Sequence, residues 1–98
     1  GKAKLKGRKR WIAFFHHPKG ALWVDDGARN ALRDKGKSLL PPGVSQCIGE
    51  FAKGDVVRIC DLQGTEFSRG ISRYNADEIR ARKLKGVEIV HRDDLVIL

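Results

Sequence analysis

The chain of 98 residues lacks the features that mark several large classes of protein. It has no apolar run near the roughly 20 residues that span a bilayer, and no charged-then-apolar stretch typical of a signal peptide. It is also too short for a complete kinase or a dinucleotide-binding enzyme. With 41% hydrophobic and 33% charged residues, we expect one cytoplasmic globular domain without a membrane partner.

Cysteine is scarce, and the few candidate metal ligands have the wrong spacing. Cys47 and Cys60 lie in separate apolar stretches, which favours buried free thiols in a reducing compartment over a disulfide. His16 and His17 are adjacent and precede Pro18, so they lack the spacing of a tetrahedral zinc site. We expect no metal site and no cofactor bound by this segment.

Acidic residues are absent from residues 1–10, which carry six lysines and arginines. Nine basic and nine acidic residues balance in residues 11–78, and residues 79–98 carry a net charge of +2. We therefore expect a basic linker arm at 1–10 and a globular domain at 11–98. The arm has no aromatic residue to stack on a base. The sequence fits two roles of the arm equally well: it binds phosphate backbones, or it serves as a solvated linker.

Residues Ala31–Ser38 spell A-x-x-x-x-G-K-S, a relaxed form of a nucleotide phosphate-binding loop. That loop requires a strand before it and a helix that starts at the Lys-Ser. Here Ala28 and Leu32 recur at helical spacing before the Gly-Lys-Ser. Pro41 and Pro42 follow it and prevent a long helix there. The order is reversed, so we interpret the match as coincidence.

The same segment predicts a helix with both of its ends marked. Asp25 and Asp26 precede it, and capping of the helix explains them better than a pair of catalytic acids. Gly36 suits the left-handed residue that ends many helices. Lys35 and Lys37 lie near the negative end of the helix dipole.

The remaining apolar runs are short and separated by turns, which is typical of a small β protein. We predict a hairpin loop at residues 52–54. The fold class is mainly β with short helices (α+β), a small pseudo-barrel of mixed strands with one helix near the N-terminus. The predicted strands are Trp11–Phe15, Ala21–Val24, Ser45–Phe51, Asp55–Leu62, Glu66–Tyr74, Val87–His91 and Leu95–Leu98.

Alternation assigns some side chains of these strands to faces. Val57 and Ile59 share one face of their strand. Phe67 and Ile71 are predicted to share a face of the next. Gly70, between them, suggests a bulge or a close backbone approach.

The chain resembles a specific family in several motifs. Three of them resemble the PUA domain, a small pseudo-barrel named for RNA pseudouridine synthases and archaeosine transglycosylases: Val24–Ala28, Lys37–Val44 and Gly49–Val57. Three more resemble the C-terminal PUA domain of bacterial glutamate 5-kinases: Arg8–Ile12, Arg69–Asn75 and Val90–Leu95. Together they cover most of residues 8–98, in the order of that family.

The resemblance implies a non-catalytic accessory module that influences the regulation or assembly of a glutamate 5-kinase. That enzyme transfers phosphate from ATP, with Mg²⁺, to the γ-carboxylate of glutamate in proline biosynthesis. Its amino-acid-kinase domain precedes the PUA domain and is absent here, so no catalytic residue is carried over. The implied partners are this upstream domain and, in addition, a homo-oligomer.

The resemblance fits poorly at residues 75–86. A helical pattern begins there, with Asn75 or Asp77 as its cap, but it ends within one turn. We expect so short a helix to be unable to pack an apolar face. In the resembled family a longer stretch lies here. Either this protein has lost that element or residues 79–85 join two segments across residues that the sequence does not contain, and we favour the second explanation.

RNA binding is the alternative function, as an autonomous PUA module of a tRNA- or rRNA-modification protein. PUA domains that bind RNA use the first helix, the loop before it and a late strand. Carried over, this face includes Gly27, Ala28, Arg29, Arg33 and Lys37, the last three at a spacing that aligns them along one side of a helix. Asp34 and the neutral charge of residues 11–78 weaken this alternative.

His91 has two interpretations. It could be an acid or base oriented by a carboxylate of Asp93 or Asp94. We favour the simpler one, in which it satisfies the corner of a strand by hydrogen bonding.

Overall fold

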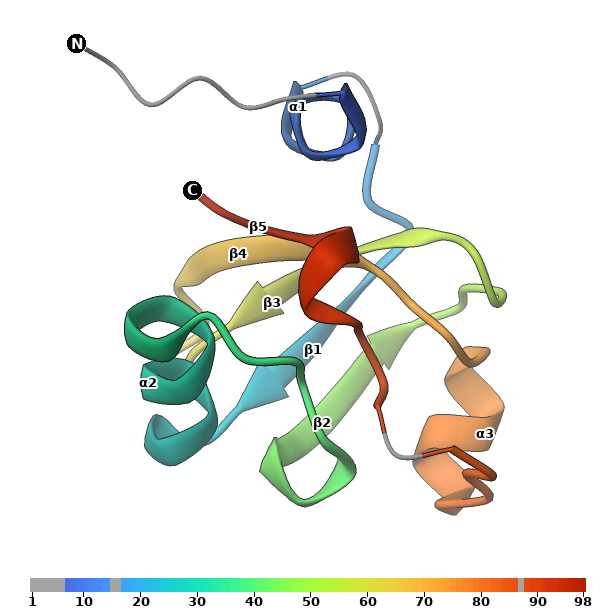
Figure 1. The fold of residues 1–98 in the computed structure, drawn as a ribbon. Helices are drawn as coiled ribbons and strands as arrows, with labels where there is room; N and C mark the ends of the chain where they lie inside the picture. The colour runs from blue at the N-terminus through green and yellow to red at the C-terminus, as the bar shows by residue number, and fades with distance from the viewer. Residues whose placement is uncertain (1–6, 15–16, 87) are drawn as a thin grey trace, which may run out of the picture.

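The computed structural model describes residues 7–14, 17–86 and 88–98, and its centre is a five-stranded sheet. The strands are β1 (Gly20–Val24), β2 (Val44–Gly49), β3 (Val56–Cys60), β4 (Glu66–Ile71) and β5 (Leu95–Ile97). Their order across the sheet is β2-β1-β3-β4-β5 (Figure 1). β1 runs parallel to β3, and the other neighbours are antiparallel. The predicted fold class, mainly β with short helices, is confirmed.

Helices lie on both sides of this sheet. They are α1 (Gly7–Phe14), α2 (Asp26–Lys35) and α3 (Ala76–Ala81), with 3₁₀ turns η1 (Pro41–Gly43) and η2 (Arg92–Asp94). Figure 1 has α2 and α3 below the sheet and α1 above it. None of the helices in the described part of the chain is long and apolar enough to cross a membrane.

The main core lies between the sheet, α2, α3 and two segments that close it from below. Leu39 and Val90 pair in an isolated antiparallel bridge, and the Leu39 N–H donates to the Val90 carbonyl at 2.9 Å. The bridge joins the segments after α2 and before η2, so the sheet and these segments together enclose the apolar side chains. The fully buried members include Leu22, Val24, Leu32, Leu39, Val57, Ile59, Ile79, Ile89 and Val90.

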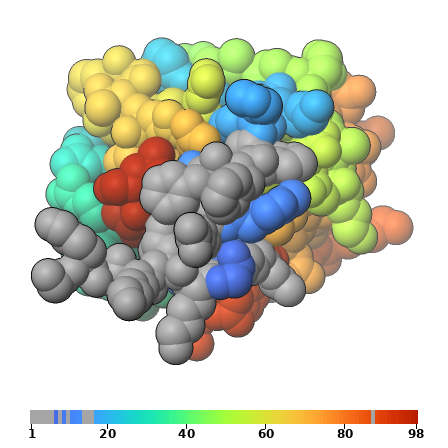
Figure 2. Space-filling view, turned by 90° about the horizontal axis from the view of Figure 1, so that it is seen from above, coloured from blue at the N-terminus to red at the C-terminus, as the bar shows by residue number. Residues whose placement is uncertain are grey.

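The predicted strand at Trp11–Phe15 is wrong for residues 11–14, which belong to α1. Ile12 and Ala13 of α1 pack on Val56 and Val96 from the outer face of the sheet, forming a second small core. Figure 2, viewed from above, places α1 across that face. Phe15 lies outside the described residues.

The predicted boundary between arm and domain falls inside α1, which begins at Gly7. Residues 1–6 lie outside the described part, and the division into an arm at 1–10 and a domain at 11–98 stays a prediction. The sequence signal was local, whereas the contacts that hold α1 come from β3 and β5.

The predicted hairpin around residues 52–54 is also wrong. A tight turn does form there, since the Ala52 N–H donates to Asp55 Oδ2 at 2.8 Å. The strands that it connects are not neighbours, however, because β1 inserts between β2 and β3.

The predicted faces hold for β3 but not for β4. Val57 and Ile59 both belong to the main core, as predicted. Phe67 packs against the main core, whereas Ile71 packs against the second core under α1. The reason is a shift in register between β3 and β4 at Cys60, because one extra residue reverses which face a side chain takes. At Gly70 the backbone of β4 lies close to Val90 and Asp94, as one of the two predicted alternatives required.

The last predicted element before β5 is shorter than expected. In the described part of residues 87–91, only Val90 makes a β-bridge, and Val87 lies outside the described residues. The strand β5 at Leu95–Ile97 agrees with the prediction.

The segment after Tyr74 packs better than its length suggested. Asn75 caps α3, and both Ala76 and Ile79 are fully buried in the main core. The prediction that this helix is too short to bury an apolar face is therefore wrong. Six residues are enough for this burial, and the capping box between Asn75 and Glu78 stabilises the first turn.

Candidate functional site

The helix α2 carries most of the residues predicted to bind RNA, and its ends form as the sequence indicated. The Asp25 carboxylate accepts a hydrogen bond from the Ala28 N–H at 2.8 Å. Gly36 adopts the left-handed conformation, with φ of 61°, and its N–H donates to the Ala31 carbonyl. These are the two ends that local chemistry alone can specify.

The same geometry rules out a phosphate loop at Ala31–Ser38. The Gly36-Lys37 pair follows the end of a helix instead of starting one. The Lys37 N–H is already bonded to the Ala31 carbonyl at 3.0 Å, so it does not point at a ligand. These residues do not fit a nucleotide phosphate.

Gly27 and Ala28 lie on one flank of α2, beside the segment that follows the helix. A cavity of about 270 Å³ is lined there by Gly27, Ala28, Ser38, Leu40 and Gly43, among others. Gly43 lies so close that a Cβ on it would come within 2.6 Å of the Ala28 Cβ.

Arg29 and Arg33 lie on a different flank of α2 from Gly27 and Ala28, since each residue advances the helix by 100°. Arg33 is exposed and pairs with Asp34 at 3.4 Å. The predicted stripe of three basic residues on one helix face is wrong for Lys37. The helix ends at Lys35, and the left-handed Gly36 turns the chain before Lys37.

Lys37 instead lies near η2. A cavity of about 460 Å³ is lined by Lys37, Ser38, Leu40, Glu88, His91 and Arg92. Ser38 Oγ accepts a hydrogen bond from the Arg92 N–H at 2.8 Å, which holds the two segments together.

His91 forms part of this corner through its ring. Its Nδ1 accepts a hydrogen bond from the Asp93 N–H at 3.0 Å and so caps η2. Its Nε2 lies 3.9 Å from Glu88 Oε1. A ring nitrogen engaged in capping is a structural group, in agreement with the hydrogen-bonding interpretation of the sequence.

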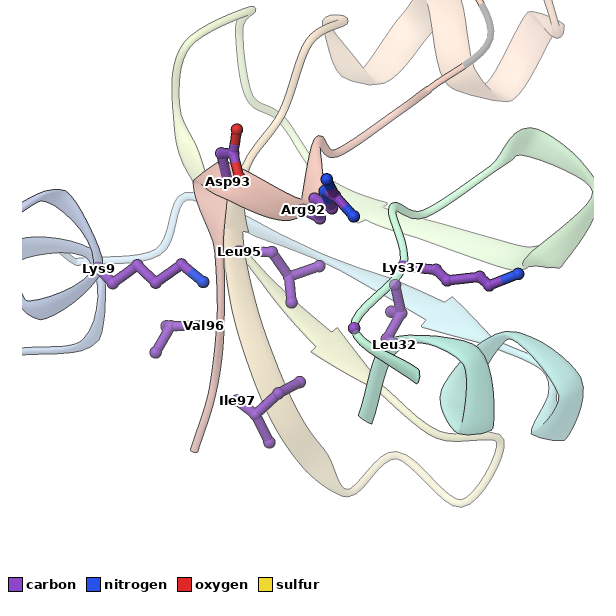
Figure 3. A pocket seen from close by; sticks show the side chains of 9 residues that line it. Lys9, Leu32, Lys37, Arg92, Asp93, Leu95, Val96 and Ile97 are labelled. Carbon is purple, nitrogen blue, oxygen red and sulfur yellow. The ribbon is translucent and has the colours of Figure 1, made fainter. Parts of the chain in front are cut away.

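A third cavity, of about 280 Å³, lies between α1, α2 and β5 (Figure 3). Its walls include Lys9, Leu32, Gly36, Leu95 and Ile97. In Figure 3 Lys9 reaches from α1 toward β5, while the Lys37 side chain points away from β5. The strand β5 and the end of α2 thus line the same cavity, and an RNA-binding face there stays a prediction.

Two basic residues at this place were not among the predicted site residues. Lys9 and Arg92 both line the cavity beside β5. Among the described residues, neither of them nor Lys37 forms an ion pair. Lys9 was assigned to the arm, and Arg92 carried no local signal beyond its neighbours His91 and Asp93.

No three side chains of His, Cys, Asp or Glu come together in a way that could bind a metal, within the part of the chain that the structure describes. His16 lies outside that part, and His17 is exposed. Cys47 and Cys60 are free thiols, and burial raises the pKa of each, so both stay protonated at neutral pH.

The comparison of the sequence with known families decides the identity of the fold. Residues 20–92 match the PUA domain. The chain belongs to the PUA domain family. The match begins at β1 and ends in η2, so α1 and β5 lie outside the matched PUA residues.

Relatives of this PUA domain are glutamate 5-kinases. The chain is 44% identical to the enzyme of Geobacter sulfurreducens, covering 100% of this chain and 30% of that protein. It is 42% identical to the enzyme of Dictyoglomus thermophilum, covering 96% and 29%. The chain thus spans less than a third of the length of these relatives, and it matches their C-terminal region.

The relatives are also longer inside the matched region. The alignment with the Geobacter protein extends over 111 positions and includes all 98 residues of the chain. The relative therefore has at least 13 positions (111 less 98) that this chain lacks. This supports the expectation that the family has a longer segment, and whether residues 79–85 join across it stays a prediction.

Solved structures agree with the fold. A PUA domain from Aeropyrum pernix, solved as a tartrate complex, superposes with a TM-score of 0.64 at 31% identity, covering 74% of this chain and 41% of that one. A complex of Cbf5, Nop10 and Gar1 contains a similar domain, with a TM-score of 0.63 at 25% identity, covering 74% and 21%.

Proposed function

We propose that this PUA domain is the C-terminal accessory module of a cytoplasmic glutamate 5-kinase and does not itself catalyse the reaction. The observation that supports the proposal is the 44% identity to such an enzyme along the whole chain. In this role the domain acts on the regulation or assembly of the kinase. Its partners are the upstream amino-acid-kinase domain and other copies of the same protein.

The chemistry of the described residues favours the non-catalytic role. The Gly-Lys-Ser match follows a helix, His91 caps a turn, and the raised pKa of both thiols removes them as nucleophiles at neutral pH. In the proposed role, ATP and Mg²⁺ bind in the preceding kinase domain, where phosphoryl transfer occurs.

The test compares three proteins from the same gene: the full-length product, the product without these 98 residues, and the 98-residue chain alone. Each is assayed for glutamate-dependent formation of ADP, with the acyl phosphate trapped by hydroxylamine. We expect turnover by the first two and none by the third. We also expect the deletion to change the oligomeric state or the response to effectors. Turnover by the 98-residue chain, or a full-length product without glutamate-dependent turnover, contradicts the proposal.

A second candidate, autonomous RNA binding, is favoured by one observation. The end of α2 meets β5 at a cavity lined by Lys9, Lys37 and Arg92, none of which forms an ion pair with another described residue. Such cations attract phosphate backbones, whatever the base sequence. A similar domain occurs in the complex of Cbf5, Nop10 and Gar1.

This candidate is tested by titrating labelled tRNA with the full chain and with a chain that begins at Gly7, which keeps α1 whole. Binding by the shorter chain, lost in Arg29→Ala with Lys37→Ala and in Lys37→Ala with Arg92→Ala, supports RNA recognition by the domain. The matched control is Lys53→Ala with Lys83→Ala, which removes two exposed charges outside α2 and η2. Binding that disappears with residues 1–6 reflects only electrostatic attraction to the arm.

A further inference from the structure

The strand β2 forms one edge of the sheet, beside the helix α3. Its sequence, Val44–Gly49, contains no charged residue and no proline, although charge, proline and short length are what keep edges from pairing. The opposite edge, β5, has only three residues and has α1 beside it. Of the two edges, β2 is the longer and the more exposed to pairing.

The carbonyl groups on the outer side of β2 are bonded to two arginine side chains. Arg82 donates from Nη2 to the Val44 carbonyl at 2.7 Å and from Nη1 to the Pro41 carbonyl at 2.9 Å. Arg80 donates to the carbonyls of Cys47, at 3.3 Å from Nε, and of Gly49. A strand that added to this edge would need the same carbonyls.

A bulge in β2 brings these carbonyls to one side. Trp23 lies opposite Gln46, but Val24 lies opposite Val44, so Ser45 is an extra residue. Without the extra residue, the carbonyls of Val44 and Cys47 would point to opposite edges, since direction alternates along a strand. With it, both face α3.

The two arginines are held in place by α3. Ile79 anchors the helix in the main core, and Arg80 also pairs with Glu50 at 3.2 Å and Asp77 at 3.5 Å. Arg82 has φ of 57° and is the one residue other than glycine with positive φ in the described part of the chain. This conformation is strained for such a residue, and the charge-assisted hydrogen bonds to Val44 and Pro41 stabilise it.

The side chains of Arg80 and Arg82 line a groove between β2 and α3. The groove has a volume of about 190 Å³ and is also lined by Val44, Cys47 and Ile79, among others. The arginine head groups therefore lie in the groove between α3 and the edge, where they bond its carbonyls.

We propose that Arg80 and Arg82 prevent β2 from pairing with β2 of a second copy of this chain. Two identical edges can pair antiparallel about a two-fold axis. The free N–H and C=O groups of each β2 then bond to those of the other. The edge has no charge to oppose this, and Ile48 on it is 42% exposed. The proposal is independent of whether the chain belongs to a kinase.

The test measures the mass of the 98-residue chain in solution over a range of concentrations, by light scattering after gel filtration. The variant is Arg80→Ala with Arg82→Ala, and the control is Lys83→Ala with Lys85→Ala, which removes the same charge from exposed neighbours. We expect the arginine variant to shift with concentration from 11.0 kDa toward twice that mass, and the control to behave like the unmodified chain.

A third variant tests whether any dimer uses the edge. Adding Gln46→Lys to the arginine variant places a charge on β2 of both copies, and we expect the mass to return to that of one chain. If the arginine variant loses its circular dichroism, Arg80→Ala alone replaces it, since the bonds of Arg82 remain. A folded arginine variant that keeps the mass of the unmodified chain, or a lysine control that dimerises equally, overturns the proposal, as does a dimer that Gln46→Lys leaves intact.

Discussion

Two glycines of this chain have opposite surroundings, and the same substitution should have opposite effects on them. A Cβ on Gly70 would lie 2.5 Å from Val90 Cγ1 and 3.1 Å from the Asp94 carbonyl. We expect Gly70→Ala to lower the free energy of unfolding by about 1–3 kcal/mol, the usual cost of overpacking. Gly27 lies in the first turn of α2, where the nearest atom to a Cβ is 3.5 Å away.

Gly27→Ala is the matched control, and we expect it to raise the free energy of unfolding by about 0.5–1 kcal/mol, because alanine loses less backbone entropy on folding. Guanidinium titrations of both variants and the parent chain measure the two effects. Equal stability of Gly70→Ala and the parent would mean that β4 and the Val90 segment are not in contact.

The two thiols predict a dependence of stability on alkaline pH. Desolvation by burial raises the pKa of Cys47 and of Cys60 from the ordinary value of 9.0. The folded state therefore holds these protons more tightly than the unfolded state. Their contribution to stability is complete below pH 9 and is lost as pH rises through the folded pKa values.

We expect the free energy of unfolding of the parent chain to fall more steeply above pH 9 than that of Cys47→Ala with Cys60→Ala. The difference between the two curves isolates the thiols from lysine and tyrosine, which titrate in the same range. Native thiols should also react with a disulfide reagent more slowly than thiols of the denatured chain. Parallel stability curves would contradict the desolvation of the two thiols in the folded state.

At the scale of elements, α3 depends on the reciprocal hydrogen bonds at its first turn. Asn75 Oδ1 accepts from the Glu78 N–H at 2.8 Å, and Glu78 Oε1 accepts from the Asn75 N–H at 2.9 Å. We expect Asn75→Ala to lower the free energy of unfolding by about 1 kcal/mol, and Asn75→Ser to change it little, because serine also caps helices well. Thermal unfolding followed by circular dichroism measures both. A loss in the serine variant as large as in the alanine variant would assign another role to Asn75.

Elements whose ends are fixed by neighbours in sequence could be predicted, and those fixed by distant contacts could not. Asp25 and Gly36 mark both ends of α2, and the structure has the helix between them. The apolar pattern of residues 11–14 fits a strand equally well, and the packing of Ile12 and Ala13 on Val56 and Val96 has no local signal in the sequence. The parallel insertion of β1 beside β3 likewise has no local signal.

The candidate site followed the same rule. The helix that carries Gly27, Ala28 and Arg29 was placed correctly, whereas Lys37 was assigned to a helix face that ends before it. Lys9 and Arg92 were missed because they meet only where α1, η2 and β5 converge. Residues brought together by the tertiary fold leave no pattern at short spacing in the sequence.

For the whole molecule, the question is whether α1 belongs to the folded domain, since the PUA match starts only at residue 20. Ile12 is completely buried, and it covers Val56, Ile71 and Val96 on the outer face of the sheet. We therefore expect α1 to be an integral part of the domain and not a loose connection to it.

This expectation is tested with two chains, one beginning at Gly7 and one beginning at Gly20. The shorter chain loses the side chain of Ile12 and should be less stable by about 2–5 kcal/mol, the range for removing one large buried aliphatic group. It should also bind a dye such as anilinonaphthalene sulfonate, because the apolar outer face is then open to water. Urea titrations and dye fluorescence measure both effects. Equal stability without dye binding would place the boundary of the domain at β1, and the covering of Val56 and Val96 would then contribute little to the folded state.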